Sequence, residues 1–174
     1  CSGTGGGKPF EETGIITDAL SFPIKVLSGL EATYSGHVLD FGEVGTLTDA
    51  DISKDQLTYT KSGWVNVRSS GPFTLRLTSQ NGYRLTFPGG DVSNSAQTLR
   101  YTARLAGTAS TSTGPSTTSL SCVRAGLTTR QIPLSAELNE GGSLKAASSS
   151  YSDILSITIA PDVFNAAATT QCAN

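Results

Sequence analysis

Hydrophobic and polar residues alternate along most of this chain, and the pattern is densest between Trp64 and Ile159. Successive side chains of a β-strand point to opposite faces, so a period of two predicts a series of strands. Turn signals such as Gly71-Pro72 and Asn81-Gly82 separate the segments. The strands expected from this alternation are 39–42, 57–60, 64–70, 73–77, 83–87, 99–105, 120–123, 132–138 and 155–159.

The rest of this part of the chain contains little that favours helix. Only residues 162–168 have a faint helical period, so we expect helix in less than about a tenth of the residues. The low-complexity segment 107–119 and the polar segment 139–150 are expected to be loops. Many short strands separated by turn signals are typical of an antiparallel β-sandwich, so the predicted fold class is all-β.

One more alternating segment, residues 15–27, lies close to the start of the chain, behind a leader that has no core-forming pattern. No hairpin turn signal folds this segment back onto the next one. It is either the first edge strand of its own sandwich or a strand that inserts elsewhere, and both interpretations remain open here. Its apolar face, which only Asp18 interrupts, consists of Ile16, Leu20, Phe22, Ile24 and Val26.

The length of 174 residues allows one domain with extended ends. The expected organisation is a flexible leader at 1–14, the amphipathic strand at 15–27, a sandwich domain at 28–161 and a tail at 162–174. Charged residues make up only 15% of the chain and the net charge is −2, which disfavours a nucleic-acid surface or a polybasic membrane patch. No run of about 18 apolar residues predicts a membrane span. The chain has 19 glycines, no methionine and no recognisable signal peptide, so we expect a processed protein located outside the cytoplasm.

The three cysteines are Cys1, Cys122 and Cys172, and none has the spacing of a zinc or redox pair. In an extracytoplasmic protein the simplest arrangement is one disulfide and one remaining thiol. Cys122–Cys172 is the first choice, because Cys1 belongs to the leader. A bond from Cys1 to a neighbouring copy and a lipidated Cys1 are the alternatives.

Catalytic chemistry has little support in the sequence, and neither a cofactor nor a metal ion is expected. His37 is the only histidine, and it fits a surface role better than a catalytic one. No nucleotide-binding or nucleophile-elbow motif occurs. Trp64, Tyr83 and Tyr101 are candidates for a sugar-binding platform, although core packing is the ordinary role of such residues. A weak calcium site is conceivable but lacks the usual ligand spacing, and the acids considered for it are Asp40, Glu43, Asp49, Asp51 and Asp55.

The order of five motifs between residues 39 and 160 resembles the spore coat protein U domain family, to which the pilins of archaic chaperone–usher pili belong. The final motif, in which Tyr151 and Asp153 precede the last strand, carries most of the resemblance, together with Phe41-Gly42. The motifs in chain order are LDFGEV, VNVRSSGPFTLRLTSQNGYRL, LRYTARL, IPLSAEL and YSDILSITI.

The resemblance implies an immunoglobulin-like sandwich that lacks its last strand and receives a donor strand from a neighbouring subunit. Residues 15–27 would be the donor strand, since the tail at 162–174 has no period of two. The first and last strands of the domain would border the acceptor groove. The residues expected to line that groove are Leu39, Phe41, Leu155, Ile157 and Ile159.

The implied function is that of a structural pilus subunit at the cell surface, which supports adhesion and biofilm formation. Its expected partners are other copies of itself, a periplasmic chaperone and an outer-membrane usher. The alternative is a self-complete sandwich, secreted or lipid-anchored, that binds carbohydrate or protein. The first function requires a filament and the second a monomer.

Overall fold

The computed structural model describes residues 29–36, 39–148, 150–162 and 172, so the candidate donor strand, Cys1 and His37 lie outside the described residues. Most of the faint helical segment 162–168 also lies outside them. The elements are β2 (Leu30–Gly36), α1 (Asp49–Lys54), β3 (Thr60–Ser69), β4 (Phe73–Ser79), β5 (Arg84–Thr86), η3 (Ser95–Gln97), β6 (Thr98–Leu105), β7 (Thr108–Thr111), β8 (Thr117–Cys122), β9 (Gly126–Leu138) and β10 (Leu155–Pro161).

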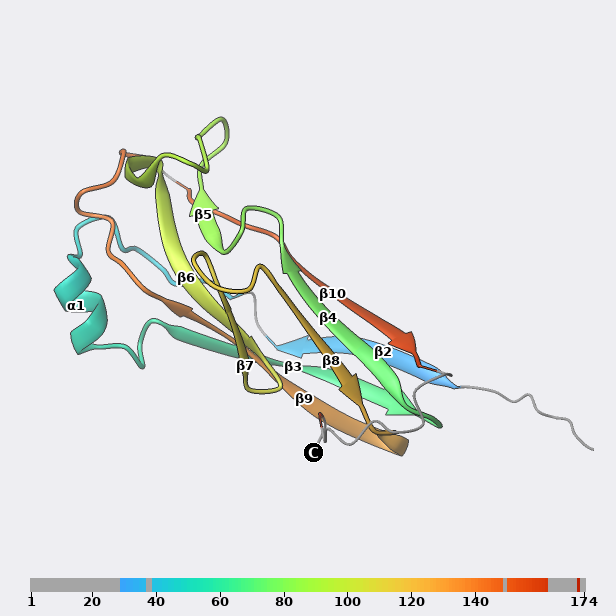
Figure 1. The fold of residues 1–174 in the computed structure, drawn as a ribbon. Helices are drawn as coiled ribbons and strands as arrows, with labels where there is room; N and C mark the ends of the chain where they lie inside the picture. Colours follow the sequence, from blue (N-terminus) through green and yellow to red (C-terminus); the bar gives the residue numbers. More distant parts are fainter. Residues whose placement is uncertain (1–28, 37–38, 149, 163–171, 173–174) are drawn as a thin grey trace, which may run out of the picture.

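Two antiparallel sheets pack face to face, as Figure 1 shows. The larger sheet has the order β2-β3-β9-β6-β5, and β7 also pairs with β6. The smaller sheet has the order β10-β4-β8. The predicted all-β fold with two packed sheets is therefore confirmed.

The core lies between the sheets and follows from the alternation in the sequence. In β4, Phe73, Leu75 and Leu77 are buried, and in β9 every second residue from Ile132 is buried. Each such side chain contributes about 1.5–3 kcal/mol when it leaves water, so this inward-facing set is the main stabilising term. The largest buried side chains are Tyr83, Phe73, Ile52, Leu75, Leu77, Leu99, Leu105, Ile132 and Leu138.

The segment 107–119 was expected to be a loop, and the structure corrects this. Most of it forms β7 and the start of β8, which pair with β6 and β4 respectively. The hydroxyls of Ser110 and Thr118 are buried and form a hydrogen bond to each other, so these polar side chains are satisfied inside the protein. Sequence reasoning failed here because serine and threonine have no apolar alternation, although threonine fits strands well.

The polar stretch before β3 contains a short helix that the sequence analysis did not expect. Thr48 accepts a hydrogen bond from the backbone N–H of Asp51, and the Asp51 carboxylate accepts one from the N–H of Thr48. This reciprocal pair is a capping box, in which aspartate takes the place of glutamate. Ile52 anchors the helix, since its side chain is fully buried. The strand expected at 57–60 is instead a turn, which ends where β3 begins at Thr60.

The first strand of the domain is also displaced from its expected position. It occupies β2, and residues 39–42 are not a strand. The Asp40 carboxylate accepts a hydrogen bond of 2.8 Å from the backbone N–H of Gly42, which stabilises a turn in place of an extended chain. The alternation of Leu39 and Phe41 thus reflects two side chains directed to the protein interior, not a paired strand.

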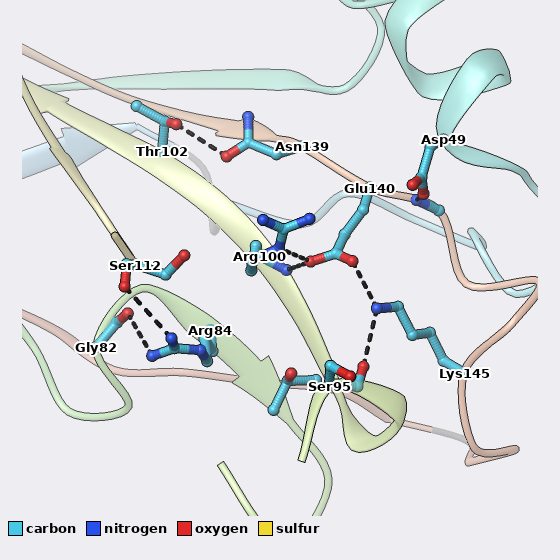
Figure 2. Close-up of polar contacts among 12 residues, drawn as sticks. Asp49, Gly82, Arg84, Ser95, Arg100, Thr102, Ser112, Asn139, Glu140 and Lys145 are labelled. Carbon is cyan, nitrogen blue, oxygen red and sulfur yellow. Dashed lines mark hydrogen bonds and ion pairs between the residues drawn. The ribbon is translucent and has the colours of Figure 1, made fainter. Parts of the chain in front are cut away.

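A buried carboxylate fixes the end of the sandwich near α1. Glu140 accepts hydrogen bonds of 2.5 Å from the side chains of Arg100 and Lys145, and Lys145 also donates to the carbonyl of Ser95, as Figure 2 shows. Burial alone raises the pKa of Glu140, but these hydrogen bonds outweigh it and hold the pKa below its ordinary value. The next residue in the chain, Gly141, donates its backbone N–H to Asp49 of α1. This Glu140 cluster therefore connects β6, α1 and the segment that follows β9.

Candidate functional site

The two lateral sides of the sandwich differ. On one side the chain passes from β7 in the larger sheet to β8 in the smaller sheet, which closes the gap between them. On the other side β2 and β10 are edge strands, and each pairs with one neighbour among the described residues. The edges of β2 and β10 therefore border an open seam between the sheets.

The strand order identifies what the seam lacks. In an immunoglobulin-like sandwich, strands A, B, E and D form one sheet, and C, F and G form the other. Here β2, β3, β9 and β6 correspond to A, B, E and D, while β4 and β10 correspond to C and F. Strand G would pair with the free edge of β10, and no strand of the described residues occupies that position.

The seam contains a cavity of about 440 Å³ with mainly apolar walls, which we call the seam groove. Four of the five side chains expected to line an acceptor groove do line it. Ile159, the fifth, lies farther along β10 and packs against the core without lining the groove. The lining residues are Tyr34, Leu39, Phe41, Leu85, Tyr101, Leu134, Ala136, Asp153, Leu155 and Ile157.

One end of the seam groove is polar. The hydroxyls of Tyr101 and Ser79 each donate a hydrogen bond of 2.5 Å to Oδ2 of Asp153. Its other oxygen, Oδ1, accepts the backbone N–H of Asn81 at 2.9 Å and that of Ile154 at 2.7 Å. Burial and the adjacent Asp153 carboxylate raise the pKa of Tyr101, so the phenol stays protonated and remains a donor.

Asp153 accordingly fixes the point at which β10 begins. It joins this segment to β6 of the opposite sheet and to the turn after β4. This explains why an aspartate stands two residues before Leu155 in the final motif of the chain. The motif is visible in the sequence, but the role of Asp153 is not, because its partners in β4, β6 and the turn after β4 lie 52 to 74 positions away.

Tyr34 forms part of the groove wall by lying over a glycine. An added Cβ at Gly63 would overlap the Tyr34 ring and its hydroxyl oxygen. Gly63 pairs with Gly36, two residues beyond Tyr34 in the β2–β3 ladder, and belongs to the buried face of β3. The absence of a side chain at Gly63 thus leaves room for the aromatic ring beside the groove. Sequence patterns did not reveal this, since Tyr34 lay outside the strands expected from alternation.

The disulfide lies in the core, away from the seam groove. Cys122 and Cys172 are joined, with 5.5 Å between their Cα atoms, which is the first of the pairings expected from the sequence. Both side chains are buried. The bond attaches residue 172 to the end of β8, so the tail is fixed to the domain at this residue.

The other candidate sites are not brought together. Tyr83 and Tyr101 are buried and stack edge to face with 5.9 Å between ring centroids, whereas Trp64 is 42% exposed on the outer face of β3. They therefore form no common sugar platform. Asp51 caps α1, and no group of three potential metal ligands occurs among the described residues. In the same part of the chain, no helix is long and apolar enough to cross a membrane.

No protein-family model matches the chain, and no curated protein matches it significantly. One solved structure with partial similarity comes from a study of the chaperone–tip adhesin complex of CFA/I fimbriae. The two chains are 16% identical, with a TM-score of 0.36, and the match covers 60% of this chain and 35% of the other. This chain therefore spans about a third of that neighbour, and a similarity at this level carries no inference about function. The resemblance to the spore coat protein U family stays a hypothesis.

Proposed function

We propose that the protein is a structural subunit of a surface filament, and that its seam groove receives residues 15–27 of another copy. The observation that carries the proposal is that no strand of the described residues pairs with the outer edge of β10, directly next to a cavity with mainly apolar walls. An edge strand offers unpaired N–H and C=O groups, and an added strand would satisfy them. The role proposed is structural and not catalytic.

Residues 15–27 suit this position by pattern and by chemistry. Five apolar side chains share one face of the segment, and alternate side chains of an added strand are the ones that enter a groove. Burying five such side chains at about 1.5–3 kcal/mol each outweighs the ladder hydrogen bond that Pro23 cannot donate. The groove walls supply matching apolar surface, including Phe41 and Ile157.

The same physics bears on how such a subunit would be assembled. A subunit with an open seam exposes apolar surface and a sheet edge, which promotes aggregation unless another strand covers them. We therefore propose that a periplasmic chaperone protects the groove and that an outer-membrane usher delivers subunits to a pilus. Adhesion and biofilm formation are the roles that such a filament would support.

A peptide-binding experiment tests the proposal directly. A variant that lacks residues 1–27 is mixed with a fluorescent peptide of residues 15–27, and binding is followed by anisotropy. We expect saturable binding, and we expect the same peptide with Phe22→Asp to bind at least about tenfold more weakly, since a charge would enter an apolar groove. Equal binding of the two peptides would contradict the proposal. A full-length chain that is monomeric and excludes the peptide would instead support a sandwich completed by its own strand.

A further inference from the structure

β3 ends and β9 begins at the end of the sandwich opposite α1 (Figure 1). Residues around these strand ends line a second cavity. Its volume is about 570 Å³, and its lining is more polar than that of the seam groove. We call it the arginine cleft. The residues that line it are Ser69, Ser70, Arg124, Ala125, Gly126, Leu127 and Arg130.

The arginine cleft contains two cations that lack partners. Within the described part of the chain, the side chains of Arg124 and Arg130 make neither an ion pair nor a hydrogen bond. By contrast, Arg68, Arg100 and Arg104 are each paired with a glutamate. Because the chain as a whole has a net charge of −2, the positive charge of this cleft is a local feature.

The backbone shapes the cleft and places one of its arginines. Pairing between β3 and β9 shifts between Val67 and Ser69, and β9 contains two additional residues at this point. Gly126 has φ +98° there, a conformation that side chains disfavour. Arg130 lies opposite Val67, on the same side of β9 as Ile132, but unlike Ile132 it is exposed at the end of the sheet. A bulge of this kind redirects side chains, and here it opens the end of the sandwich around a cation.

The remaining lining residues complete a site of mixed character. The Ser69 hydroxyl donates to the carbonyl of Gly71, whereas the Ser70 side chain is exposed and can donate to a ligand. Leu127 is 76% exposed and offers an apolar contact beside the charges. Guanidinium groups bind carboxylates and sulfates through paired hydrogen bonds. A saccharide that bears such groups also presents C–H faces and hydroxyls that match Leu127 and Ser70.

We infer that the arginine cleft binds an acidic oligosaccharide, with Arg124 and Arg130 holding its carboxylate or sulfate group. Nucleic acid is a poorer match, because phosphate backbones require an extended basic surface and only two unpaired cations occur here. The site is independent of the seam groove, which lies between the edges of β2 and β10. A subunit could therefore be polymerised and still bind through this cleft.

Calorimetric titration of the full-length protein tests the inference with three probes at low salt. These are an oligogalacturonate, a sulfated heparin oligosaccharide and neutral maltohexaose. We expect binding of at least one acidic probe, no binding of the neutral one, and an affinity that falls as salt increases. The preference between the two acidic probes distinguishes a carboxylate ligand from a sulfate ligand.

A charge-matched pair of variants localises the site. Arg124→Gln with Arg130→Gln should lower the affinity at least about tenfold, since two charge-assisted contacts are lost. Lys54→Gln with Arg76→Gln removes the same charge from exposed positions outside the cleft and should have little effect. Arg124→Gln alone is a second test variant. Because Arg124 lies outside every strand, this substitution should not disturb folding. Equal losses in the two double variants, or no binding of either acidic probe, would overturn the inference.

Discussion

The phenol oxygen of Tyr101 lies 2.5 Å from Oδ2 of Asp153, and this hydrogen bond joins the two sheets at the polar end of the seam groove. Tyr101 belongs to β6 in the larger sheet, and Asp153 precedes β10 in the smaller one. The bond therefore sets the separation of the sheets where the groove is open. It also restrains β10, whose free edge would receive an added strand.

Removing this hydroxyl should destabilise the domain more than removing an ordinary one. We expect Tyr101→Phe to lower the free energy of unfolding by about 1.5–3 kcal/mol, because a hydrogen bond to a carboxylate is stronger than a neutral one. Tyr151→Phe is the matched control: the Tyr151 hydroxyl donates 2.6 Å to the carbonyl of Ala146, and its loss should cost about 0.5–1.5 kcal/mol. Urea unfolding measures both. Equal losses of unfolding free energy in the two variants would show that the hydrogen bond to Asp153 is no stronger than a neutral one.

The same bond predicts a loss of stability at alkaline pH. The pKa of Tyr101 is raised above its ordinary value of 10.0, mainly by burial and then by the hydrogen bond to Asp153. Because the pKa is raised in the folded state, the contribution of the Tyr101 phenol to the free energy of unfolding is complete below pH 10. This contribution is lost as the pH rises towards the folded-state pKa. The decline in unfolding free energy above pH 10 should be smaller in Tyr101→Phe. Identical pH profiles would refute this assignment.

The Glu140 cluster predicts the opposite pH dependence. The pKa of Glu140 is lowered in the folded state. Its contribution to the free energy of unfolding is therefore present above the ordinary pKa of 4.5 and is lost as the pH falls below that value. At neutral pH, Glu140→Gln should cost about 3 kcal/mol, since it leaves the buried Lys145 ammonium without its carboxylate. The control Glu31→Gln breaks an exposed pair with Arg68 and should cost less than about 1 kcal/mol. Chemical denaturation at pH 7 and pH 4 measures both effects, and similar costs for the two variants would contradict the prediction.

The disulfide predicts a large difference between oxidised and reduced protein. The bond spans 50 positions. In the chain-entropy model, a cross-link over a loop of that length restricts the unfolded chain and stabilises the folded state by about 4 kcal/mol. Replacing Cys122 and Cys172 with alanine should reduce the unfolding free energy by about that amount. Cys1→Ser should leave it unchanged. A small effect of the double replacement would indicate that the reduced chain retains structure when unfolded.

The contact between Gly63 and Tyr34 gives a prediction specific to the groove. In Gly63→Ala the new methyl group would displace the Tyr34 ring, which lines the groove, so affinity for the peptide of residues 15–27 should fall. Gly71→Ala is the control, because an added Cβ there meets no atom within 4 Å. Anisotropy titrations of the two variants, in the background without residues 1–27, make the comparison. Unchanged affinity in Gly63→Ala would place strand binding away from Tyr34.

Filament formation provides the final prediction. Phe22→Asp in the full-length protein should abolish filaments, because the largest apolar side chain of residues 15–27 would become charged. Electron microscopy and gels run without boiling measure assembly. Thr17→Asp, on the opposite face of the same segment, should assemble normally. Normal filaments from Phe22→Asp would refute donation by this segment.

The sequence alone determined the fold class and most strands, because the period of two in segments such as 73–77 and 132–138 is a local property. The alternation also placed Leu155 and Ile157 on one face of a correctly located strand, and both line the groove. Leu39 and Phe41 line it as well, although the strand expected for them does not form. Local capping chemistry at Thr48 was present in the sequence and could have revealed α1.

The tertiary structure decided the features that depend on distant partners. The pair of Ser110 and Thr118 joins two parts of a segment that composition alone assigns to a loop. The Asp153 network and the Glu140 cluster join residues outside the expected strands to β6, which lies far away in the sequence. The open seam also required the structure, because it is defined by which described strands pair with β2 and β10 and not by the residues of those strands. The physical reason is that burial and hydrogen bonding depend on which segments meet in space, whereas alternation depends only on neighbours in the chain.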